Sequence, residues 1–320
     1  MKQTQYTYPS ATGQCTIHAW QWCPEHRTPK AAILLHHGMA EHTGRYKNAL
    51  RALVEDYGYA VFMNDMANHG QSNDNEAMLG YFGKTDGWKK IIADAHHLFE
   101  IMYKEYPNLK HIVGGHSMGS FIMRSYFNFY HDPVDGAIFI GTSGKNALAG
   151  VGIGLTSLIC GLKGPTCKTQ MLYEIALGGY DKPFEHRTRY DWGIRDTKSV
   201  DDYVADPKCG FLFTAAGYRD LMHLVTDCNS AKWFANMPKD LPILLLSGDK
   251  DPVGNFGKGV TEVRDRLKAT GHTNVTMKLY GNARHEILNE LNKESVYQDL
   301  DAWITNMILH PPVQKEEVSK

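Results

Sequence analysis

The chain has 320 residues, which is enough for one large or two modest domains. Its apolar share of 42% and its charged share of 22% are those of an ordinary globular protein. Lysine and arginine number 34 against 35 for aspartate and glutamate, and this balance gives no argument for nucleic acid, an anionic membrane surface or a polyacidic partner.

Three further features of the sequence indicate which compartment, disulfides and metals to expect. The first residues show neither an apolar core nor a cleavage-like site, so we expect no signal peptide and a cytoplasmic location. Six scattered cysteines without a C-x-x-C pair favour free buried thiols, while a Cys160–Cys167 disulfide stays possible. The histidines show no metal-ligand spacing, although His36, His37 and His42 are close in sequence, so we expect no metal and no cofactor.

In chain order, apolar runs and helical periodicity alternate. Residues 4–22 alternate polar and apolar around Thr12-Gly13-Gln14, which predicts a two-strand hairpin. Buried strands are predicted at 31–35, 59–63, 111–113, 136–140, 242–246 and 274–280. Helices are predicted at about 46–57, 88–106, 118–126, 257–270 and 287–307. The alternation with short loops predicts an α/β fold, a mostly parallel, doubly wound sheet of about eight strands.

The alternation stops between residues 143 and 236, where no run typical of a buried strand occurs. Residues 146–162 are apolar and rich in glycine, which favours an apolar helix over a membrane span. We therefore predict a core made of 1–142 and 237–320, with a mainly helical cap inserted at 143–236. Residues 310–320 are predicted to form a disordered tail.

One turn carries the strongest chemical signal. Residues 111–113 form a short apolar run, Gly115-His-Ser-Met-Gly119 follows, and a helical pattern continues from Phe121. The G-x-S-x-G pattern alone is weak, because serine in a glycine-rich turn is usually only a turn residue. The strand before it and the helix after it are the context of a nucleophile elbow, so we predict that Ser117 is a nucleophile.

A serine nucleophile needs a base, and the base needs a carboxylate to orient it. Such groups lie in loops at the carboxyl ends of strands in a doubly wound sheet. Asp249 and Asp251 follow one late predicted strand, and His285 follows the next. The order Ser, Asp, His is the one expected for such a sheet. We choose Asp251 as the acid and His285 as the base, and Asp249 is the alternative acid.

The negative oxygen formed on attack needs N–H donors. One is expected from the backbone of Met118, directly after the nucleophile, and the other from the loop after the 31–35 strand. We assign the second donor to the backbone of Met39. Glu41, His42 and Arg45 are interpreted as polar neighbours that hold the shape of this loop.

Several motifs together resemble the monoacylglycerol lipase and lysophospholipase group of the α/β-hydrolases, in particular its bacterial members. They are residues 37–46, 115–119, 248–253 and 284–285, with cap features between 184 and 211. The resemblance covers about residues 5–308. One loop departs from it: residues 65–72 carry Ala67 and Asn68 where arginine and glycine are common in the group. That loop is structural in the group, so the departure leaves the predicted triad intact.

The resemblance implies hydrolysis of a carboxylic ester through an acyl-enzyme on Ser117, with a single-chain lipid ester such as monoacylglycerol or lysophospholipid as substrate. It also implies that the apolar cap segment at 147–162, and Ala149 to Leu162 within it, lines a tunnel for the acyl chain. We expect no nucleic acid as a partner and at most transient membrane contact through the cap.

Other functions use the same residues. A small-ester carboxylesterase, a thioesterase, an acyltransferase or a peptidase that removes N-terminal residues could carry the same triad. The peptidase would need an acidic group in the cap to hold an amine. A non-catalytic binding module is a further alternative, although such proteins tend to lose a triad member and all three are present here.

Overall fold

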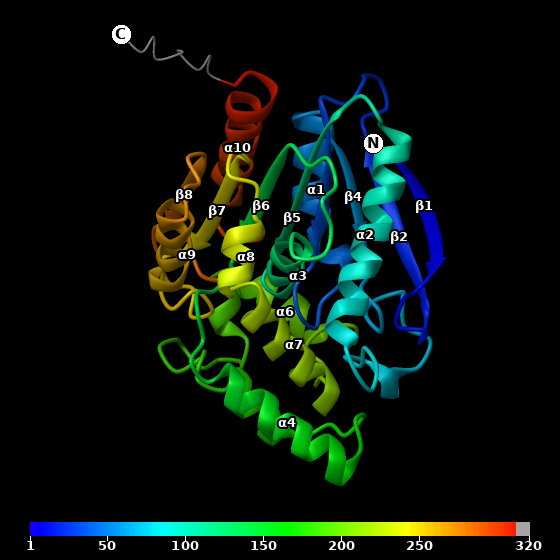
Figure 1. The fold of residues 1–320 in the computed structure, drawn as a ribbon, viewed down its shortest axis with the longest axis vertical. Coiled ribbons are helices and arrows are strands. Elements are labelled where there is room, and N and C mark those ends of the chain that lie inside the picture. The colour runs from blue at the N-terminus through cyan, green and yellow to red at the C-terminus, as the bar shows by residue number, and fades with distance from the viewer. Residues whose placement is uncertain (312–320) are drawn as a thin grey trace.

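The computed structural model describes residues 1–311 and has one eight-stranded sheet at its centre (Figure 1). The strands are β1 Lys2–Pro9, β2 Thr16–Cys23, β3 Ala31–His36, β4 Ala60–Asn64, β5 Lys110–His116, β6 Gly136–Ile140, β7 Ile243–Gly248 and β8 Val275–Tyr280. Their order is β1-β2-β4-β3-β5-β6-β7-β8. The pairs β1–β2 and β2–β4 are antiparallel and the other five pairs are parallel. The predicted hairpin and the mostly parallel sheet are confirmed.

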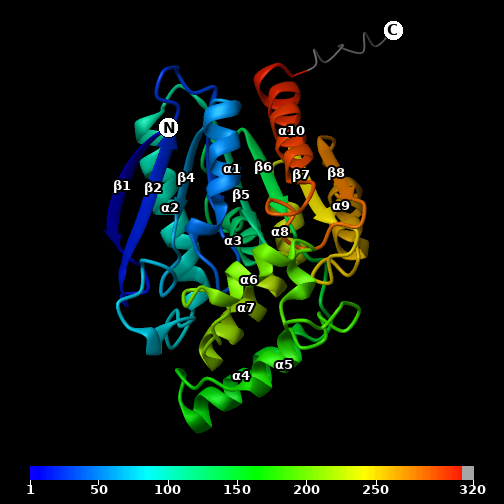
Figure 2. The same ribbon diagram turned by 180° about the vertical axis from the view of Figure 1, so that it is seen from behind.

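Helices cover both faces of this sheet. The core helices are α1 Lys47–Arg51, α2 Gly87–Glu105, α3 Met118–Tyr126, α8 Ala231–Asn236, α9 Lys258–Ala269 and α10 Lys293–Ile304. Short 3₁₀ and π-type turns are η1 Thr43–Tyr46, η2 Ala52–Asp56, η3 Glu76–Met78, η4 Asp191–Gly193 and η5 Thr305–Leu309. Figure 1 shows α2, α3, α8 and α9 on one face, and Figure 2 shows α1 and α10 on the other.

Successive residues of a strand point to opposite faces of the sheet, so the protein has a hydrophobic core on each face. Leu34 belongs to the cluster that contains Ile92 of α2 and Ile122 of α3. Its neighbour Ile33 belongs to the cluster that contains Leu50 of α1 and Trp303 of α10. Both clusters are buried, which is why the central strands read as continuous apolar runs in the sequence.

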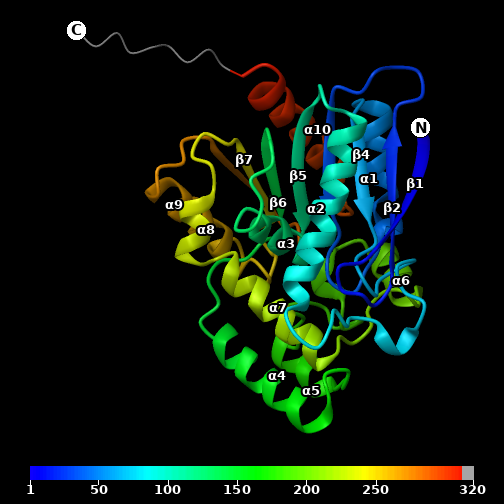
Figure 3. The ribbon, with the colours of Figure 1, turned by 45° about the vertical axis from the view of Figure 1, so that its right-hand side comes forward.

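Four further helices come from the segment between β6 and β7, which we call the cap segment (143–236); its last residues form α8, whose Trp233 packs against Phe139 of β6. The four further helices are α4 Ala149–Lys163, α5 Gln170–Ala176, α6 Thr197–Ala205 and α7 Ala215–Asp227. Figure 3 shows them gathered at the end of the sheet where the parallel strands finish. The domain boundaries themselves stay a prediction.

The last helix begins later than the sequence predicts. Its periodic residues start at Ile287, but α10 begins at Lys293, and the residues between form turns. The carboxylate of Glu290 accepts hydrogen bonds from the backbone N–H groups of Arg284 and Leu291, at 2.9 Å each, which holds this stretch in turns. The predicted disordered tail lies outside the described residues, apart from His310 and Pro311.

The described residues bear on two further predictions, one about a disulfide and one about a membrane-spanning helix. All six cysteines lie among them and are free thiols, so Cys160 and Cys167 are not bonded to each other. Within residues 1–311, no helix has the length and apolar character needed to cross a membrane.

Candidate active site

A cavity of about 520 Å³ lies between the carboxyl ends of the parallel strands and the cap segment. Ser117, His285, Met39 and Met118 all line it. Asp251 does not line it, because this side chain is fully buried behind His285. The structure therefore brings together the five residues predicted from the sequence, although they come from four loops far apart in the chain.

Ser117 sits on the sharp turn between β5 and α3. Its backbone has φ 54° and ψ −121°, a strained conformation for a residue with a side chain. The flanking glycines are needed for close approach: a Cβ on Gly115 would lie 2.3 Å from the backbone of Gly119, and a Cβ on Gly119 would lie 2.4 Å from the carbonyl oxygen of His36. The Ser117 side chain makes no capping hydrogen bond to α3, and it lines the cavity.

His285 and Asp251 form a buried pair. The His285 Nδ1 lies 2.9 Å from Asp251 Oδ2, which fixes the tautomer and leaves Nε2 as the free ring nitrogen. The carboxylate of Asp251 also accepts from the Ser247 hydroxyl and the Val253 backbone N–H, each at 2.9 Å. Burial raises the pKa of the Asp251 carboxyl, but the charge and hydrogen bond of His285 and the two other donors together hold the pKa below its usual value. Asp249 makes no contact of this kind with His285.

Two aromatic rings hold the imidazole of His285. The His116 ring lies 4.6 Å from the His285 ring, and the Trp192 ring from the cap segment lies 5.3 Å away on centroid distances. Both residues lie in motifs that carry the family resemblance, but the sequence indicates no role for either in the site.

The loop after β3 runs alongside Ser117. A Cβ on Gly38 would lie 3.2 Å from the Ser117 Cβ, so the Gly38–Met39 backbone passes close to the nucleophile. Glu41 holds this loop, because its Oε1 accepts the Gly38 N–H at 2.6 Å. Met118 is the first residue of α3, where backbone N–H groups have no partner inside the helix. This arrangement suits two backbone donors that point to a reacting oxygen beside Ser117.

The residues of the cap segment that line the cavity differ from those predicted. From 147–162 only Ala147 and Leu148 line the cavity, so the prediction that Ala149 to Leu162 line it is wrong. Helix α4 packs against α7, and a Cβ on Gly152 would lie 3.2 Å from Met222 Cγ. The wall is made by apolar residues near α5 and on α7: Tyr173, Ala176, Leu177, Leu221, Met222 and Val225. Sequence periodicity could not show which cap helix faces inward.

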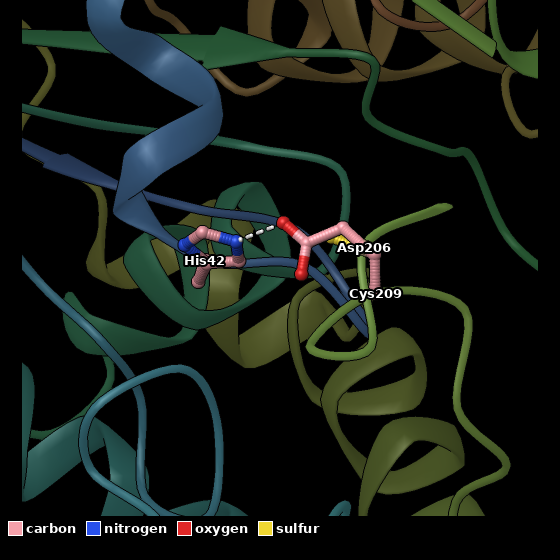
Figure 4. Close-up of side chains that lie close together, drawn as sticks. All are labelled: His42, Asp206 and Cys209. Carbon is pink, nitrogen blue, oxygen red and sulfur yellow. Dashed lines mark hydrogen bonds and ion pairs between the residues drawn. The ribbon is translucent and has the colours of Figure 1, made fainter. Parts of the chain in front are cut away.

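A group of three potential metal ligands lies beside this site. His42, Asp206 and Cys209 offer ligand atoms within 4.8 Å of one another (Figure 4). The His42 Nδ1 accepts the Gly44 N–H at 3.1 Å, so its proton is on Nε2, which donates to Asp206 Oδ2 at 2.9 Å. Burial raises the pKa of the Cys209 thiol above its usual value. His42 and Asp206 thus form a hydrogen-bonded contact between the loop after β3 and the cap segment.

The other two histidines of the group His36, His37 and His42 lie in the core. His37 Nδ1 faces the Gly38 carbonyl oxygen at 2.8 Å and its Nε2 accepts the Met66 N–H at 2.9 Å. His36 is fully buried in β3, and burial lowers its pKa to about 3, so it is a neutral core residue.

Comparison with known proteins identifies relatives over most of the chain. Residues 27–292 match the family described as serine aminopeptidase, S33. The chain is 28% identical to the monoacylglycerol lipase of Mycolicibacterium smegmatis over 294 residues, which is 89% of this chain and 91% of the relative. It is 27% identical to the human monoglyceride lipase over 297 residues, 87% of this chain and 83% of the relative. The crystal structure of a carboxyl esterase from Bacillus coagulans superimposes with a TM-score of 0.89 at 28% identity, and covers 96% of this chain and 99% of that one.

The sheet, the turn at Ser117 and these relatives define the class of the protein as a serine hydrolase with the α/β-hydrolase fold. It resembles the monoacylglycerol lipases and esterases within that class. The chain belongs to the S33 family named above, whose match spans more than half of its length.

Proposed function

We propose that this enzyme hydrolyses the ester bond of single-chain lipids such as monoacylglycerol or lysophospholipid, through an acyl-enzyme on Ser117. The observation that carries the proposal is the convergence of Ser117 and the His285–Asp251 pair on one cavity with an apolar wall. Its volume of about 520 Å³ is within the range of sites for small ligands.

The geometry supports a two-step acyl transfer. His285 Nε2 takes the proton as the Ser117 Oγ attacks the ester carbonyl carbon, and Asp251 steadies the imidazolium that forms. The backbone N–H groups of Met39 and Met118 bind the negative oxygen. His285 then gives the proton to the leaving alcohol, and the acyl group stays on Ser117. Water, activated by His285, repeats the sequence and releases the fatty acid.

The composition of the cavity favours a lipid ester over a peptide. A peptidase that removes N-terminal residues needs a carboxylate in the cap to hold the amine, and the cap residues that line the cavity include no aspartate or glutamate among the described residues. Outside the cap, three glutamates line the cavity, and each is paired with an arginine. Glu41 and Glu286 lie 3.1 and 2.7 Å from Arg45, and Glu262 lies 3.4 Å from Arg266. These observations support the esterase function despite the aminopeptidase description of the family.

The inward wall of the cap predicts a dependence on chain length. Leu177 follows α5 and lines the cavity, so Leu177→Trp should fill part of the space for an acyl chain. We expect kcat/KM for p-nitrophenyl palmitate to fall about tenfold or more, while kcat/KM for p-nitrophenyl acetate changes little.

The matched control is Val204→Trp, because Val204 is on α6, is 52% exposed and does not line the cavity. It should leave the ratio of long-chain to short-chain kcat/KM unchanged. Equal losses on acetate and palmitate in Leu177→Trp would remove the support for an acyl site at this wall.

The outer face of the cap supports transient contact with a lipid surface. Six of the twelve exposed large hydrophobic residues of the described chain lie between residues 148 and 175, on or beside α4 and α5. They are Leu148, Val151, Leu158, Leu162, Met171 and Ile175. Figure 2 shows α4 and α5 at the tip of the cap, away from the sheet. A cytoplasmic location stays an expectation from the sequence.

We therefore expect Leu158→Glu combined with Leu162→Glu to weaken activity on lipid presented in vesicles. Two carboxylates on this face disfavour burial in an apolar surface. Hydrolysis of monoacylglycerol in neutral phosphatidylcholine vesicles should fall severalfold, and hydrolysis of dissolved p-nitrophenyl acetate should not. An unchanged rate on vesicles would contradict this role of the cap.

A further inference from the structure

A buried chain of charged side chains links three loops of the candidate active site. Arg45 Nη2 lies 2.7 Å from Glu286 Oε2, and Arg45 Nη1 lies 3.1 Å from Glu41 Oε2. The other oxygen of Glu41 lies 3.3 Å from His116 Nδ1. The side chains of Glu41 and His116 are 4% and 6% exposed, so water contributes little to their solvation. The chain thus runs from the residue after His285 to the residue before Ser117.

The hydrogen-bond partners of His116 indicate its protonation state. Nδ1 faces the Glu41 carboxylate, and Nε2 faces the carbonyl oxygen of His285 at 3.3 Å. The Tyr46 hydroxyl lies 3.2 Å from Nδ1, but it is closer to Glu41, at 2.8 Å, and donates its proton there. Both ring nitrogens therefore face oxygen acceptors, which a neutral imidazole cannot satisfy because it carries one N–H.

The balance of charge leads to the same state. Glu41 is a buried carboxylate and Glu286 is a largely buried one, 13% exposed, and Arg45 supplies one positive charge between them. A charged His116 supplies the second, and without it one carboxylate would be buried without a counter-charge. The other ionisable groups that face His116 are Asp251 and His285, from the loops after β7 and β8.

The pKa directions agree with this assignment. Burial lowers the pKa of His116, but the hydrogen bond and charge of Glu41, with smaller contributions from Glu286 and Asp251, raise the pKa above its usual value. Burial raises the pKa of Glu41, but His116 and Arg45 hold the pKa of this carboxyl well below its usual range.

We infer that His116 is a positioning residue that acts as a buried imidazolium. On one side it holds Glu41, whose Oε1 also accepts the Gly38 N–H at 2.6 Å and so fixes the loop that carries Met39. On the other side it holds the backbone of His285. One charged ring beside Ser117 thereby sets the separation between the oxyanion donors and the general base.

The kinetic test rests on the proposed function and uses p-nitrophenyl butyrate. His116→Gln keeps hydrogen-bonding atoms but removes the charge, and we expect kcat to fall about tenfold or more with KM changed less than about twofold. The matched control is His111→Gln, since His111 is equally buried but lies at the other end of β5 and bonds to the Tyr106 carbonyl oxygen. This control should keep its kcat.

A second variant separates charge from simple packing. Adding Glu41→Gln to His116→Gln removes one carboxylate with the lost cation and leaves Arg45 balanced by Glu286. We expect the double variant to recover part of the kcat lost in His116→Gln. Losses that multiply in the double variant, or an unchanged kcat in His116→Gln, would overturn the inference.

A measurement on the wild-type enzyme does not depend on any activity. Long-range ¹H–¹⁵N correlations of histidine side chains, assigned to His116 by comparison with His116→Gln, should show both ring nitrogens protonated at pH 7. A single neutral tautomer would overturn the inference even if the kinetic changes were seen. A failure of the ester assay with an imidazolium at His116 would count against the proposed function alone.

Discussion

Replacing Ser117 with alanine is expected to lower kcat for p-nitrophenyl butyrate and for 1-monoacylglycerol by roughly 10³-fold to 10⁶-fold. The variant lacks the oxygen that accepts the acyl group, and no other hydroxyl occupies the apex of the turn. The fold should be kept, because alanine has the same Cβ in the strained backbone and the serine side chain makes no capping hydrogen bond to α3.

The control is Ser125→Ala on the same helix, α3. The Ser125 hydroxyl is buried and has no hydrogen-bond partner among the described residues, so its removal should leave kcat close to that of the wild type. Thermal unfolding of both variants, followed by circular dichroism, checks that they are folded. Turnover in Ser117→Ala at a rate near that of the wild type would contradict the acyl-enzyme.

Asp251→Asn carries the second largest expected effect, a fall in kcat of about 10³-fold to 10⁴-fold. Asparagine cannot stabilise the imidazolium by charge, and its amide N–H₂ can donate to His285 Nδ1 and favour the wrong tautomer. The three hydrogen bonds that the Asp251 carboxylate accepts, from His285, Ser247 and Val253, make its orientation well determined. The measurement is kcat for p-nitrophenyl butyrate at pH 8.

Asp249→Asn provides the matched control two residues away. Asp249 was the alternative acid in the sequence, but the structure brings Asp251 to His285 at 2.9 Å. We expect Asp249→Asn to change kcat by less than about threefold, as for a change outside the catalytic network. A larger loss in Asp249→Asn than in Asp251→Asn would reverse the assignment of the acid.

The sequence predicts most of the sheet, and the five residues proposed for the active site come together in the structure, because both depend on local patterns. Apolar runs such as 136–140 and 242–246 become β6 and β7, since strands buried on both faces need continuous apolar residues. Gly115 and Gly119 identify the turn around Ser117, because only glycine permits the close approach seen there. Loops at the carboxyl ends of parallel strands then bring Asp251 and His285 to one edge.

What the sequence does not predict depends on contacts between distant segments. The apolar pattern of 147–162 is correct for a helix, but α4 directs its buried side to α7 and exposes Val151, Leu158 and Leu162. The start of α10 depends on Glu290, whose carboxylate bonds to backbone groups of the His285 loop.

The charged state of His116 depends on a similar long-range contact. Glu41 lies 75 positions away in the chain, and its carboxylate approaches His116 only when β3 and β5 pair in the sheet. The sequence interpretation of Glu41 as a residue that shapes its loop agrees with its bond to the Gly38 N–H. Nothing in the sequence indicated that Glu41 contacts His116 on the turn that carries Ser117.

The most direct test of the account is to identify the acyl-enzyme. The wild-type protein would be mixed with 1-monoacylglycerol, quenched in acid within the first turnovers and digested, and the peptides would be mapped by mass spectrometry. We predict one fatty acyl group on the peptide that contains Ser117, and none in Ser117→Ala treated in the same way. Hydrolysis of the glyceride with no acyl group on Ser117, or with the acyl group on another residue, would contradict an acyl-enzyme on Ser117.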